Sequence, residues 1–280
     1  GCAELHTDKS TFTHNIAGRG GAISLVGDTD GNVAHILPST SFISNSATLG
    51  GGGAIYWNSY LPDIDSNHKL DIDNLAVYGN FIASAARYIR LNNTDFVMTT
   101  QNTVPFGPSV IVNDHYNMKV IDLDFNREIL NLRAFSLTGQ SFGDVTSSVD
   151  EYGHASFSTF GLAAFPGYHL VVFEATQDSI APLKLNITVE DCILGQFLLR
   201  QKDSYACTTC EPGMFSATVN PNECKLCPEG TFGLNKGITK CKLCPANMFS
   251  KNGSLLCGEA QVDSSVELLT NLRRKTTTQS

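Results

Sequence analysis

Short apolar stretches alternate with polar residues along the chain, and turn-forming residues separate them. In residues 105–191 the alternation predicts about seven short β-strands. Turns are expected at pairs such as Gly139-Gln140 and Pro166-Gly167, because glycine and proline favour turn conformations. This segment is therefore expected to fold as a β-sandwich. The expected strands cover residues 109–113, 118–125, 130–138, 144–149, 155–160, 168–175 and 183–190.

Residues 1–104 follow a longer period, because the motifs Phe-x-x-Asn and Gly-Gly-Ala-Ile recur in them. The first copy spans residues 10–23, the second residues 40–56, and a diverged third copy residues 77–89. The copies are spaced by 30 and then 35 residues, which indicates stacked coils of a β-solenoid. Phe, Ile and Ala side chains are expected to stack on like residues one coil away, and Asn side chains to bond along the stack.

These two motifs resemble the repeats of polymorphic outer membrane protein-type right-handed β-helices. Such repeats occur in bacterial adhesins and in large protist and algal surface proteins. The resemblance implies that residues 1–104 are the end of a longer parallel β-helix. We expect that more coils precede Gly1 or that another subunit docks there, and that the isolated Cys2 bonds to this missing part.

Eight of the nine cysteines lie between Cys192 and Cys257. The motif Cys-x-x-Gly-x-Phe begins at four positions spaced by 18, 17 and 17 residues, with Asn247 in place of Gly in the last copy. Such a short repeat cannot build a core, and a disulfide within each copy would contribute about 3 kcal/mol by loop closure. The expected bonds are Cys192–Cys207, Cys210–Cys224, Cys227–Cys241 and Cys244–Cys257.

Two other chemistries fit the Cys-x-x-Cys pairs of this segment. Cys207/Cys210 with Cys224/Cys227 have the spacing of a zinc ribbon, but zinc would leave the first and last cysteines of the array without a role. A redox-active pair usually follows a strand and opens a helix, whereas these pairs lie among Pro, Gly and Lys. Disulfides are therefore the preferred interpretation.

Two further resemblances to known families concern the cysteine-rich segment and the middle segment. Residues 192–257 resemble the ephrin-receptor-like cysteine-rich repeat, which implies an extracellular, disulfide-stapled rod or stalk and not a catalyst. Residues 153–157 and 166–173 are similar to late strands of bacterial-type immunoglobulin-like and filamin-like modules. That similarity implies that the middle segment is an Ig-like spacer or adhesive unit.

The composition narrows the class of protein. Lys and Arg number 19 against 27 Asp and Glu, a net charge of -8, so a nucleic-acid partner is not expected. With 42% hydrophobic and 16% charged residues the chain is not of the disordered type. No apolar run approaches the ~18 residues of a membrane span. Asn-x-Ser/Thr sequons predict N-glycans at Asn92, Asn186 and Asn252.

No catalytic residue, no cofactor and no metal site are expected. The Gly-x-Ser-x-Gly motif of a nucleophile elbow is absent, and the seven histidines show no metal-ligand spacing. Residues 63–67 are similar to the start of a calcium loop, but His68 and Asn74 stand where such a loop needs Gly and Glu. A solvated acidic loop is therefore the preferred interpretation.

The chain is expected to be mainly β, with four parts. Residues 1–104 are interpreted as β-solenoid coils, 105–191 as an Ig-like β-sandwich, and 192–258 as the cysteine-rich repeats. Residues 259–280 are expected to form a short helix, with a possible capping box that starts at Ser264, and a polar tail.

The parts together indicate a non-enzymatic extracellular structural protein. It would associate with itself or with other extracellular structural subunits in a surface or filamentous structure. The combination resembles large extracellular surface proteins of protists and algae, among which flagellar-hair (mastigoneme) proteins are one group. One alternative is an adhesin or receptor ectodomain that binds glycans or another cell, with Tyr56 and Trp57 as a sugar-stacking pair, although core or interface packing suits this pair better. A third possible function, after the structural protein and the adhesin, is that of a β-helix enzyme that acts on polysaccharides.

Overall fold

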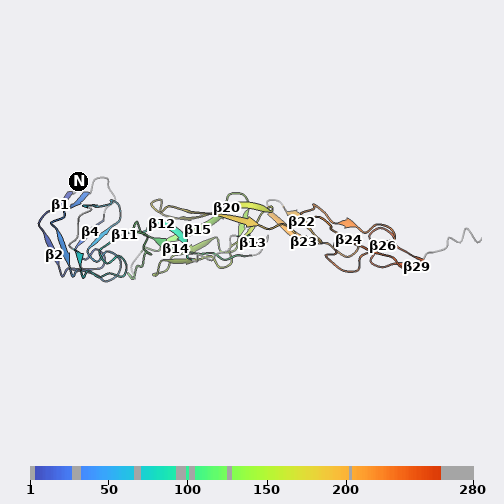
Figure 1. Cartoon of the computed structure of the whole chain (residues 1–280), viewed down its shortest axis with the longest axis horizontal. Helices are drawn as coiled ribbons and strands as arrows, with labels where there is room; N and C mark the ends of the chain where they lie inside the picture. Colours follow the sequence, from blue (N-terminus) through green and yellow to red (C-terminus); the bar gives the residue numbers. More distant parts are fainter. Residues whose placement is uncertain are drawn as a thin grey trace, which may run out of the picture. The chain divides into compact units, whose positions relative to one another are not determined.

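The computed structural model of the chain describes residues 4–26, 33–65, 71–92, 99–100, 105–124, 128–201 and 204–259. Within these ranges the elements are strands, and no helix occurs. No helix in this described part is therefore long and apolar enough to cross a membrane. The chain divides into two compact units, Gly1–Val189 and Glu190–Ser280 (Figure 1). The helix expected near Ser264 lies outside the described residues.

The first unit begins with three stacked repeats, here called N-terminal repeats 1, 2 and 3. Each contributes one strand to each of three parallel sheets, whose orders are β1-β5-β9, β2-β6-β10 and β4-β8-β11. The short strands β3 and β7 pair beside them. Repeat 1 contains β1 (Glu4–Thr7), β2 (Thr11–Thr13), β3 (Ile16–Ala17) and β4 (Ile23–Leu25); repeat 2 contains β5 (Val33–Ile36), β6 (Ser41–Ile43), β7 (Ser46–Ala47) and β8 (Ile55–Trp57); repeat 3 contains β9 (Asp63–Ile64), β10 (Asp71–Ile72) and β11 (Ile82–Ser84).

The register brings like residues of successive repeats into contact. Phe12 lies opposite Phe42, and their rings stack with centroids 5.1 Å apart. Ile55 lies between Ile23 and Ile82 in the β4-β8-β11 sheet. These side chains share one apolar cluster inside the repeats, and Phe42 and Ile55 are fully buried in it. Stacking on an identical neighbour thus replaces the conventional core that a single repeat is too short to build.

A ladder of asparagine side chains runs along the same stack. The Nδ2 of Asn15 donates to Oδ1 of Asn45 at 2.8 Å, and the Nδ2 of Asn45 donates to Oδ1 of Asn74 at 2.9 Å. Asn45 is fully buried and also donates to the carbonyl of Phe12. The amide side chains therefore connect all three repeats, with the buried Asn45 at the centre.

The register of repeat 3 corrects the sequence-based alignment. The motif spacing predicts Asn80 at the ladder position, 35 residues after Asn45, whereas the structure places Asn74 there, 29 residues on. The motif is not recognisable in repeat 3 because Asp71 lies opposite Phe42 in the sheet, where the other repeats have phenylalanine. The ladder position kept its amide while the residue that marks the motif changed.

Glycine is required where the backbones of successive repeats approach each other. A Cβ on Gly21 would lie 2.2 Å from the carbonyl oxygen of Gly53, and a Cβ on Gly53 would lie 2.0 Å from that of Asn80. No side chain fits at such distances. The Gly-Gly-Ala-Ile motif therefore marks a contact between repeats as well as a turn.

Residues 114–123 cover the far side of repeat 3. The fully buried Asp114 accepts the backbone N–H of Ser84, at the end of β11, with Oδ2 at 3.1 Å. Met118, Val120 and Ile121 pack on Tyr56, Tyr78 and Ala83. Beside β11, the side of repeat 3 that faces away from repeat 2 is thus covered by a hydrogen-bonding carboxylate and apolar side chains.

An ion pair fixes the same segment to repeat 1. Arg19 Nη2 lies 2.6 Å from Oδ1 of Asp122. Burial acts to lower the pKa of Arg19, but the hydrogen bond and charge of Asp122 raise this pKa above its usual value. The guanidinium stays charged, and the pair links repeat 1 to the covering segment.

The rest of the first unit contains mainly antiparallel sheets around one large core, although β13 pairs in parallel with β21. The buried side chains of these sheets, Phe157, Phe160 and Phe173 among them, belong to a single cluster. The sheet orders are β12-β14-β18, β13-β21-β20-β15-β17 and β16-β19. The strands are β12 (Tyr88–Leu91), β13 (Thr99–Thr100), β14 (Ser109–Asn113), β15 (Asn131–Ser136), β16 (Gln140–Phe142), β17 (Thr146–Ser148), β18 (His154–Ser156), β19 (Gly161–Ala163), β20 (Gly167–Ala175) and β21 (Leu183–Val189).

The strands differ from the expected ones in several places. Strands β16 and β19 pair with each other outside the expected ranges, and β16 begins at Gln140, where a turn was expected. Residues 118–124 form no strand, because Asp114 Oδ1 accepts the N–H groups of Tyr116 and Met118 and holds a turn there. Their apolar residues cover the N-terminal repeats instead of alternating in a sheet. Strands β12 and β13 precede residue 105 yet pair with strands that follow it, so the segments expected on either side share sheets.

The second unit is a row of small antiparallel hairpins, one for each cysteine repeat. The hairpins are β22 (Gln196–Gln201) with β23 (Ser204–Thr209), β24 (Met214–Phe215) with β25 (Lys225–Leu226), β26 (Thr231–Phe232) with β27 (Lys242–Leu243), and β28 (Met248–Phe249) with β29 (Gly258–Glu259). Phenylalanine of each motif lies in the first strand of its hairpin.

The asparagine ladder yields a test of stability. We expect Asn45→Ala to lower the free energy of unfolding by about 1–3 kcal/mol, because the carbonyl of Phe12 and the backbone N–H of Asn15 lose their side-chain partner and the buried Oδ1 of Asn74 keeps only one of its two donors. Asn15→Ala is the matched control and should cost less, since Asn15 is exposed and the buried Oδ1 of Asn45 keeps the backbone N–H of residue 15 as a donor. Urea unfolding followed by fluorescence of the single Trp57 measures both. Equal losses in the two variants would contradict a ladder whose central member is the buried one.

Candidate functional site

Four disulfides form the framework of the second unit. Each joins the two cysteines of one repeat, and the pairs are those that the sequence repeat predicts. Cys210 and Cys227 are fully buried and Cys192 nearly so, so the sulfur atoms take the place of a core. The bonds are Cys192–Cys207, Cys210–Cys224, Cys227–Cys241 and Cys244–Cys257.

This arrangement excludes both alternatives, the zinc site and the redox-active pair, because each needs free thiols that the disulfides consume. A disulfide sulfur has no thiolate to offer zinc, and each Cys-x-x-Cys pair is split between two different disulfides. The zinc-ribbon and redox interpretations of the array therefore do not apply. Cys2, expected to bond outside the chain, lies outside the described residues.

Backbone hydrogen bonds connect each cysteine repeat to the next in a regular pattern. The N–H of Cys210 donates to the carbonyl of Gly195, that of Cys227 to Gly213, and that of Cys244 to Gly230, each at 2.9 Å. The N–H groups of the same three glycines donate onward, to the carbonyls of Ser216, Gly233 and Ser250. The fourth residue of each motif therefore serves as the connecting point between repeats.

This connecting residue adopts a left-handed backbone conformation. The φ angles are +83° at Gly195, +82° at Gly213, +75° at Gly230 and +66° at Asn247. Glycine and asparagine are the residues that tolerate this region best, which explains why Asn replaces Gly in the last copy. The exchange conserves the turn.

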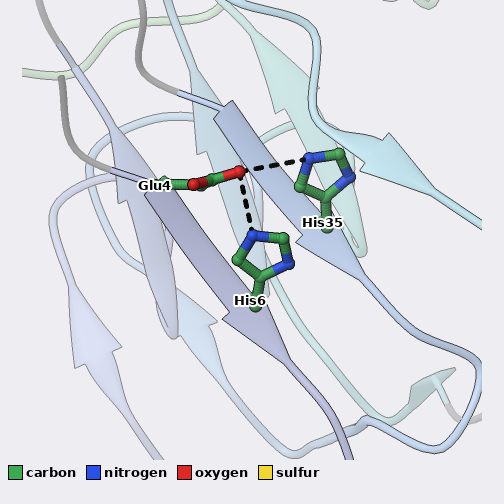
Figure 2. Close-up of side chains that lie close together, drawn as sticks. All are labelled: Glu4, His6 and His35. Carbon is green, nitrogen blue, oxygen red and sulfur yellow. Dashed lines mark ion pairs between the residues drawn. The ribbon is translucent and has the colours of Figure 1, made fainter.

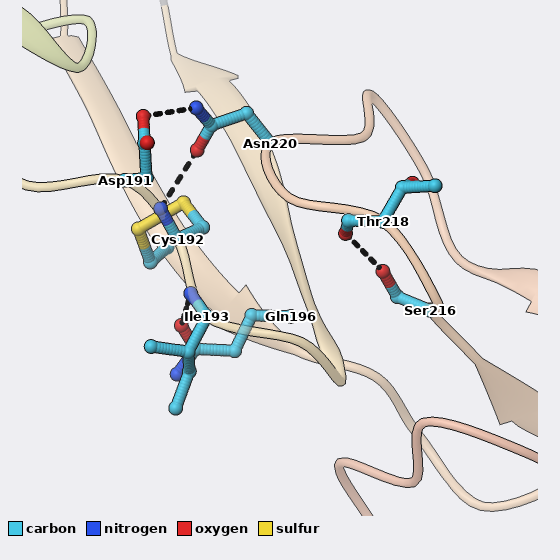
Figure 3. Close-up of a disulfide and its surroundings, with 8 residues drawn as sticks. Asp191, Cys192, Ile193, Gln196, Ser216, Thr218 and Asn220 are labelled. Atoms are coloured by element: carbon cyan, nitrogen blue, oxygen red, sulfur yellow. Dashed lines mark hydrogen bonds between the residues drawn. A yellow bond between two sulfur atoms is a disulfide. The ribbon is translucent and has the colours of Figure 1, made fainter.

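A side-chain contact also ties the first disulfide to the second repeat. Asn220 accepts the backbone N–H of Cys192 with its Oδ1 at 2.7 Å and donates through Nδ2 to Asp191 at 2.5 Å (Figure 3). Asn220, in the loop of the second cysteine repeat, thus connects that loop to residues 191 and 192 near the start of the unit. Sequence motifs gave no signal for it, because Asn220 lies outside the recurring positions.

The three sequon asparagines lie on the surface. Asn92 follows β12, Asn186 lies in β21 with its side chain on the exposed face, and Asn252 lies in a turn of the last cysteine repeat. Their glycosylation stays a prediction, and each position leaves room for a glycan.

The aromatic pair considered for sugar stacking is inside the protein. Trp57 is 3% exposed and Tyr56 is 9% exposed. The indole N–H of Trp57 donates to the hydroxyl of Tyr116 at 3.2 Å, and the guanidinium of Arg87 lies 4.7 Å from the indole ring centroid. The pair therefore packs the interface between the N-terminal repeats and the segment that follows.

The calcium-loop interpretation also loses a ligand. Asn74, at the last position of that loop, is buried in the asparagine ladder and bonded to Asn45. Asp63 lies in β9, where its Oδ2 is 2.9 Å from Nδ1 of His35. Residues 66–70 lie outside the described part, so the loop itself is not described.

A group of potential metal ligands lies on the β1-β5-β9 sheet and was missed from the sequence. Glu4 and His6 come from β1 and His35 from β5, and their ligand atoms all lie within 4.8 Å of one another (Figure 2). His6 and His35 are far apart in sequence and match no local metal-ligand spacing. They become neighbours only because β1 and β5 pair in register. The spacing of the repeats was the signal that would have paired them.

Comparisons with known proteins match two short parts of the chain. Residues 213–254 match the family described as tyrosine-protein kinase ephrin type A/B receptor-like. Residues 39–56 match the Chlamydia polymorphic membrane protein repeat. A comparison with curated proteins gives no match. The two matches and the four disulfides indicate an extracellular or surface protein.

Two of the connecting glycines, Gly213 and Gly230, test whether the close contact between repeats or the left-handed backbone requires glycine at this motif position. A Cβ on Gly213 would lie 2.3 Å from the carbonyl oxygen of Gly253, whereas a Cβ on Gly230 would meet nothing within 4 Å. Gly230→Ala should therefore cost only the left-handed backbone, about 1–2 kcal/mol, and Gly213→Ala clearly more.

Hydrogen exchange at the amide of Gly253, which donates to Cys227, measures the local loss with all disulfides intact. Equal acceleration by the two substitutions would show that the left-handed φ, and not the close contact between repeats, sets the need for glycine.

Proposed function

We propose that this chain is a non-enzymatic extracellular structural protein that assembles through its N-terminal repeats. In this proposal the three N-terminal repeats are coils of a right-handed parallel β-helix. The antiparallel sheets after them form an Ig-like sandwich, and the cysteine repeats form a stalk. The parallel in-register sheets, the single core of the antiparallel sheets and the row of disulfide-linked hairpins support these three assignments.

The observation that carries the proposal is that, among the described residues, the stacking pattern continues to repeat 1 with no cover like the one beside β11. In the ladder, the Oδ1 of Asn45 accepts from Asn15 and that of Asn74 accepts from Asn45. The Oδ1 of Asn15 has no donor among the described residues, and Asn15 is exposed. A further asparagine in the same position would complete the series.

The backbone of β2 offers the same kind of open position. Ser41 N–H donates to Ser10 C=O and His14 N–H donates to Ile43 C=O, so these groups of repeat 1 face β6. Because backbone groups alternate along a strand, those of Thr11 and Thr13 face the opposite side. Strand β2 is the last strand of its sheet on this side in the described part of the chain. Such an edge accepts a further strand.

The far end of the stack differs. There Asp114 accepts the outward N–H of Ser84, and residues 114–123 cover the apolar surface. An added strand is therefore favoured at repeat 1 and excluded beside Ser84. This cover is confined to β11, because β9 and β10 are edge strands of their sheets in the described part of the chain. The partner we propose at repeat 1 is another coil of the same pattern, from a second copy or another extracellular structural subunit.

The narrower form of the proposal is a filament of the flagellar-hair type. It rests on the resemblance to large protist and algal surface proteins, and on a chain made of repeats that stack on one another. The adhesin alternative loses its sugar-stacking pair, because Tyr56 and Trp57 are buried.

A substitution at the open edge tests the assembly. Thr13→Pro removes an outward N–H and places a ring in the path of an added strand, without removing a hydrogen bond to β6. Thr13→Val is the matched control, since it also loses the hydroxyl but keeps the N–H. We expect the unchanged chain and Thr13→Val to associate with rising concentration, and Thr13→Pro to stay monomeric.

Sedimentation velocity gives the association state, and electron microscopy of negatively stained samples shows whether the associated species are filaments. A chain that remains a monodisperse monomer at its highest soluble concentration would overturn self-assembly. If that monomer also binds glycans, the adhesin function would replace the structural one.

A further inference from the structure

Two histidines and two carboxylates lie together on the outer face of the β1-β5-β9 sheet. The parallel register places His6 opposite His35 and His35 opposite Asp63, so the three side chains form a column across three repeats. Glu4 lies on the same face, two residues before His6 in β1. The neighbours of the two histidines along their strands point inward, since Thr7, Ala34 and Ile36 are buried. The column is therefore fixed by strands whose other face belongs to the protein interior.

The imidazole rings are oriented by their neighbours. The two rings stack with centroids 4.7 Å apart and planes 12° from parallel. His6 Nε2 lies 3.0 Å from Oε1 of Glu4, and His35 Nε2 lies 4.0 Å from the same oxygen. Figure 2 shows both rings presenting a nitrogen to the Glu4 carboxylate from neighbouring strands. Two nitrogen atoms and one oxygen thus converge on one point.

We propose that Glu4, His6 and His35 bind a divalent transition-metal ion of the zinc class. Imidazole nitrogen and carboxylate oxygen are the ligands that zinc takes at about 2.0–2.2 Å. In a tetrahedral site such bonds place the ligand atoms about 3.3–3.5 Å apart. The distances of 3.0 and 4.0 Å to Glu4 bracket this value, and all three ligand atoms lie within 4.8 Å of one another, so side-chain rotations that draw the ligand atoms together would complete the site. The fourth position is open to water.

Asp63 orients one of the ligands from outside the metal shell. Its Oδ2 lies 2.9 Å from Nδ1 of His35, so it accepts the Nδ1 proton and leaves the Nε2 lone pair directed at the site. A carboxylate behind a metal-binding histidine fixes the tautomer and makes the ring a stronger ligand. This contact distinguishes the group from a chance meeting of polar side chains, because it prepares His35 for a cation.

A divalent ion bound by both rings would also neutralise the Glu4 carboxylate that lies beside them. The bound ion would join β1, the edge strand, to β5 and so hold repeat 1 on repeat 2. It needs one chain only, and its test is independent of assembly.

Isothermal titration calorimetry with ZnCl₂ tests the site on the metal-stripped full chain. All variants carry Cys2→Ser, because a thiol would bind zinc by itself. We expect one ion per chain, with the affinity lowered at least about tenfold by His6→Ala or His35→Ala, and about 10-fold or more by Asp63→Asn. His14→Asn is the matched control. It removes one histidine outside the site, and asparagine tolerates the φ of +55° at that position.

Two further readouts separate the site from other zinc binding. Zn²⁺ should raise the thermal unfolding midpoint of the parent and of His14→Asn, and leave that of His35→Ala unchanged. Co²⁺ bound in place of zinc should give the visible absorption of a low-coordinate nitrogen and oxygen site, absent in His6→Ala. Absence of saturable Zn²⁺ binding by the chain that carries Cys2→Ser alone would overturn the proposal. So would full affinity in both His6→Ala and His35→Ala, since the ion would then lie elsewhere.

Discussion

The structure depends on hydrogen bonds between successive repeats, because no repeat is long enough to satisfy its own backbone or bury its own core. In the N-terminal repeats the strands pair in parallel with the next repeat, and Asn45 connects its two neighbours. In the cysteine repeats each connecting glycine accepts from the next cysteine and donates to the residue beyond. The two units meet one requirement with different means, a shared apolar interior in the first and disulfides in the second.

Close backbone contact explains where side chains are not allowed. Gly53 between repeats of the first unit and Gly213 in the second both face a carbonyl oxygen at a distance that excludes a Cβ. At Gly230 the space is open, so only the left-handed φ favours glycine there. The same letter in a sequence motif therefore records two different constraints, and only the three-dimensional contacts separate them.

Much of this arrangement could be predicted from the sequence, because a repeat shows its period directly. The four disulfide pairs and the asparagine position in repeats 1 and 2 follow from equal spacing. Repeat 3 could not be aligned, since Asp71 replaced the phenylalanine while Asn74 kept the ladder. The strand expected at 118–125 failed because its apolar residues cover other repeats, and alternation does not reveal what a residue packs against. Glu4, His6 and His35 required the register between strands, which no local motif contains.

A stack of repeats is weakest at its ends, where a repeat has one neighbour instead of two. The described residues cover β11 of repeat 3 with Asp114 and the apolar residues around it, and they include no equivalent cover at the edge of repeat 1. An open edge must be flexible enough to accept a partner yet ordered enough to present its strand in register. A metal ion between β1 and β5 would supply that order through exposed side chains of the sheet face, without using the backbone groups of β2 that a partner strand needs. The proposed metal site and the proposed assembly edge are thus compatible because they use different groups of the same repeat.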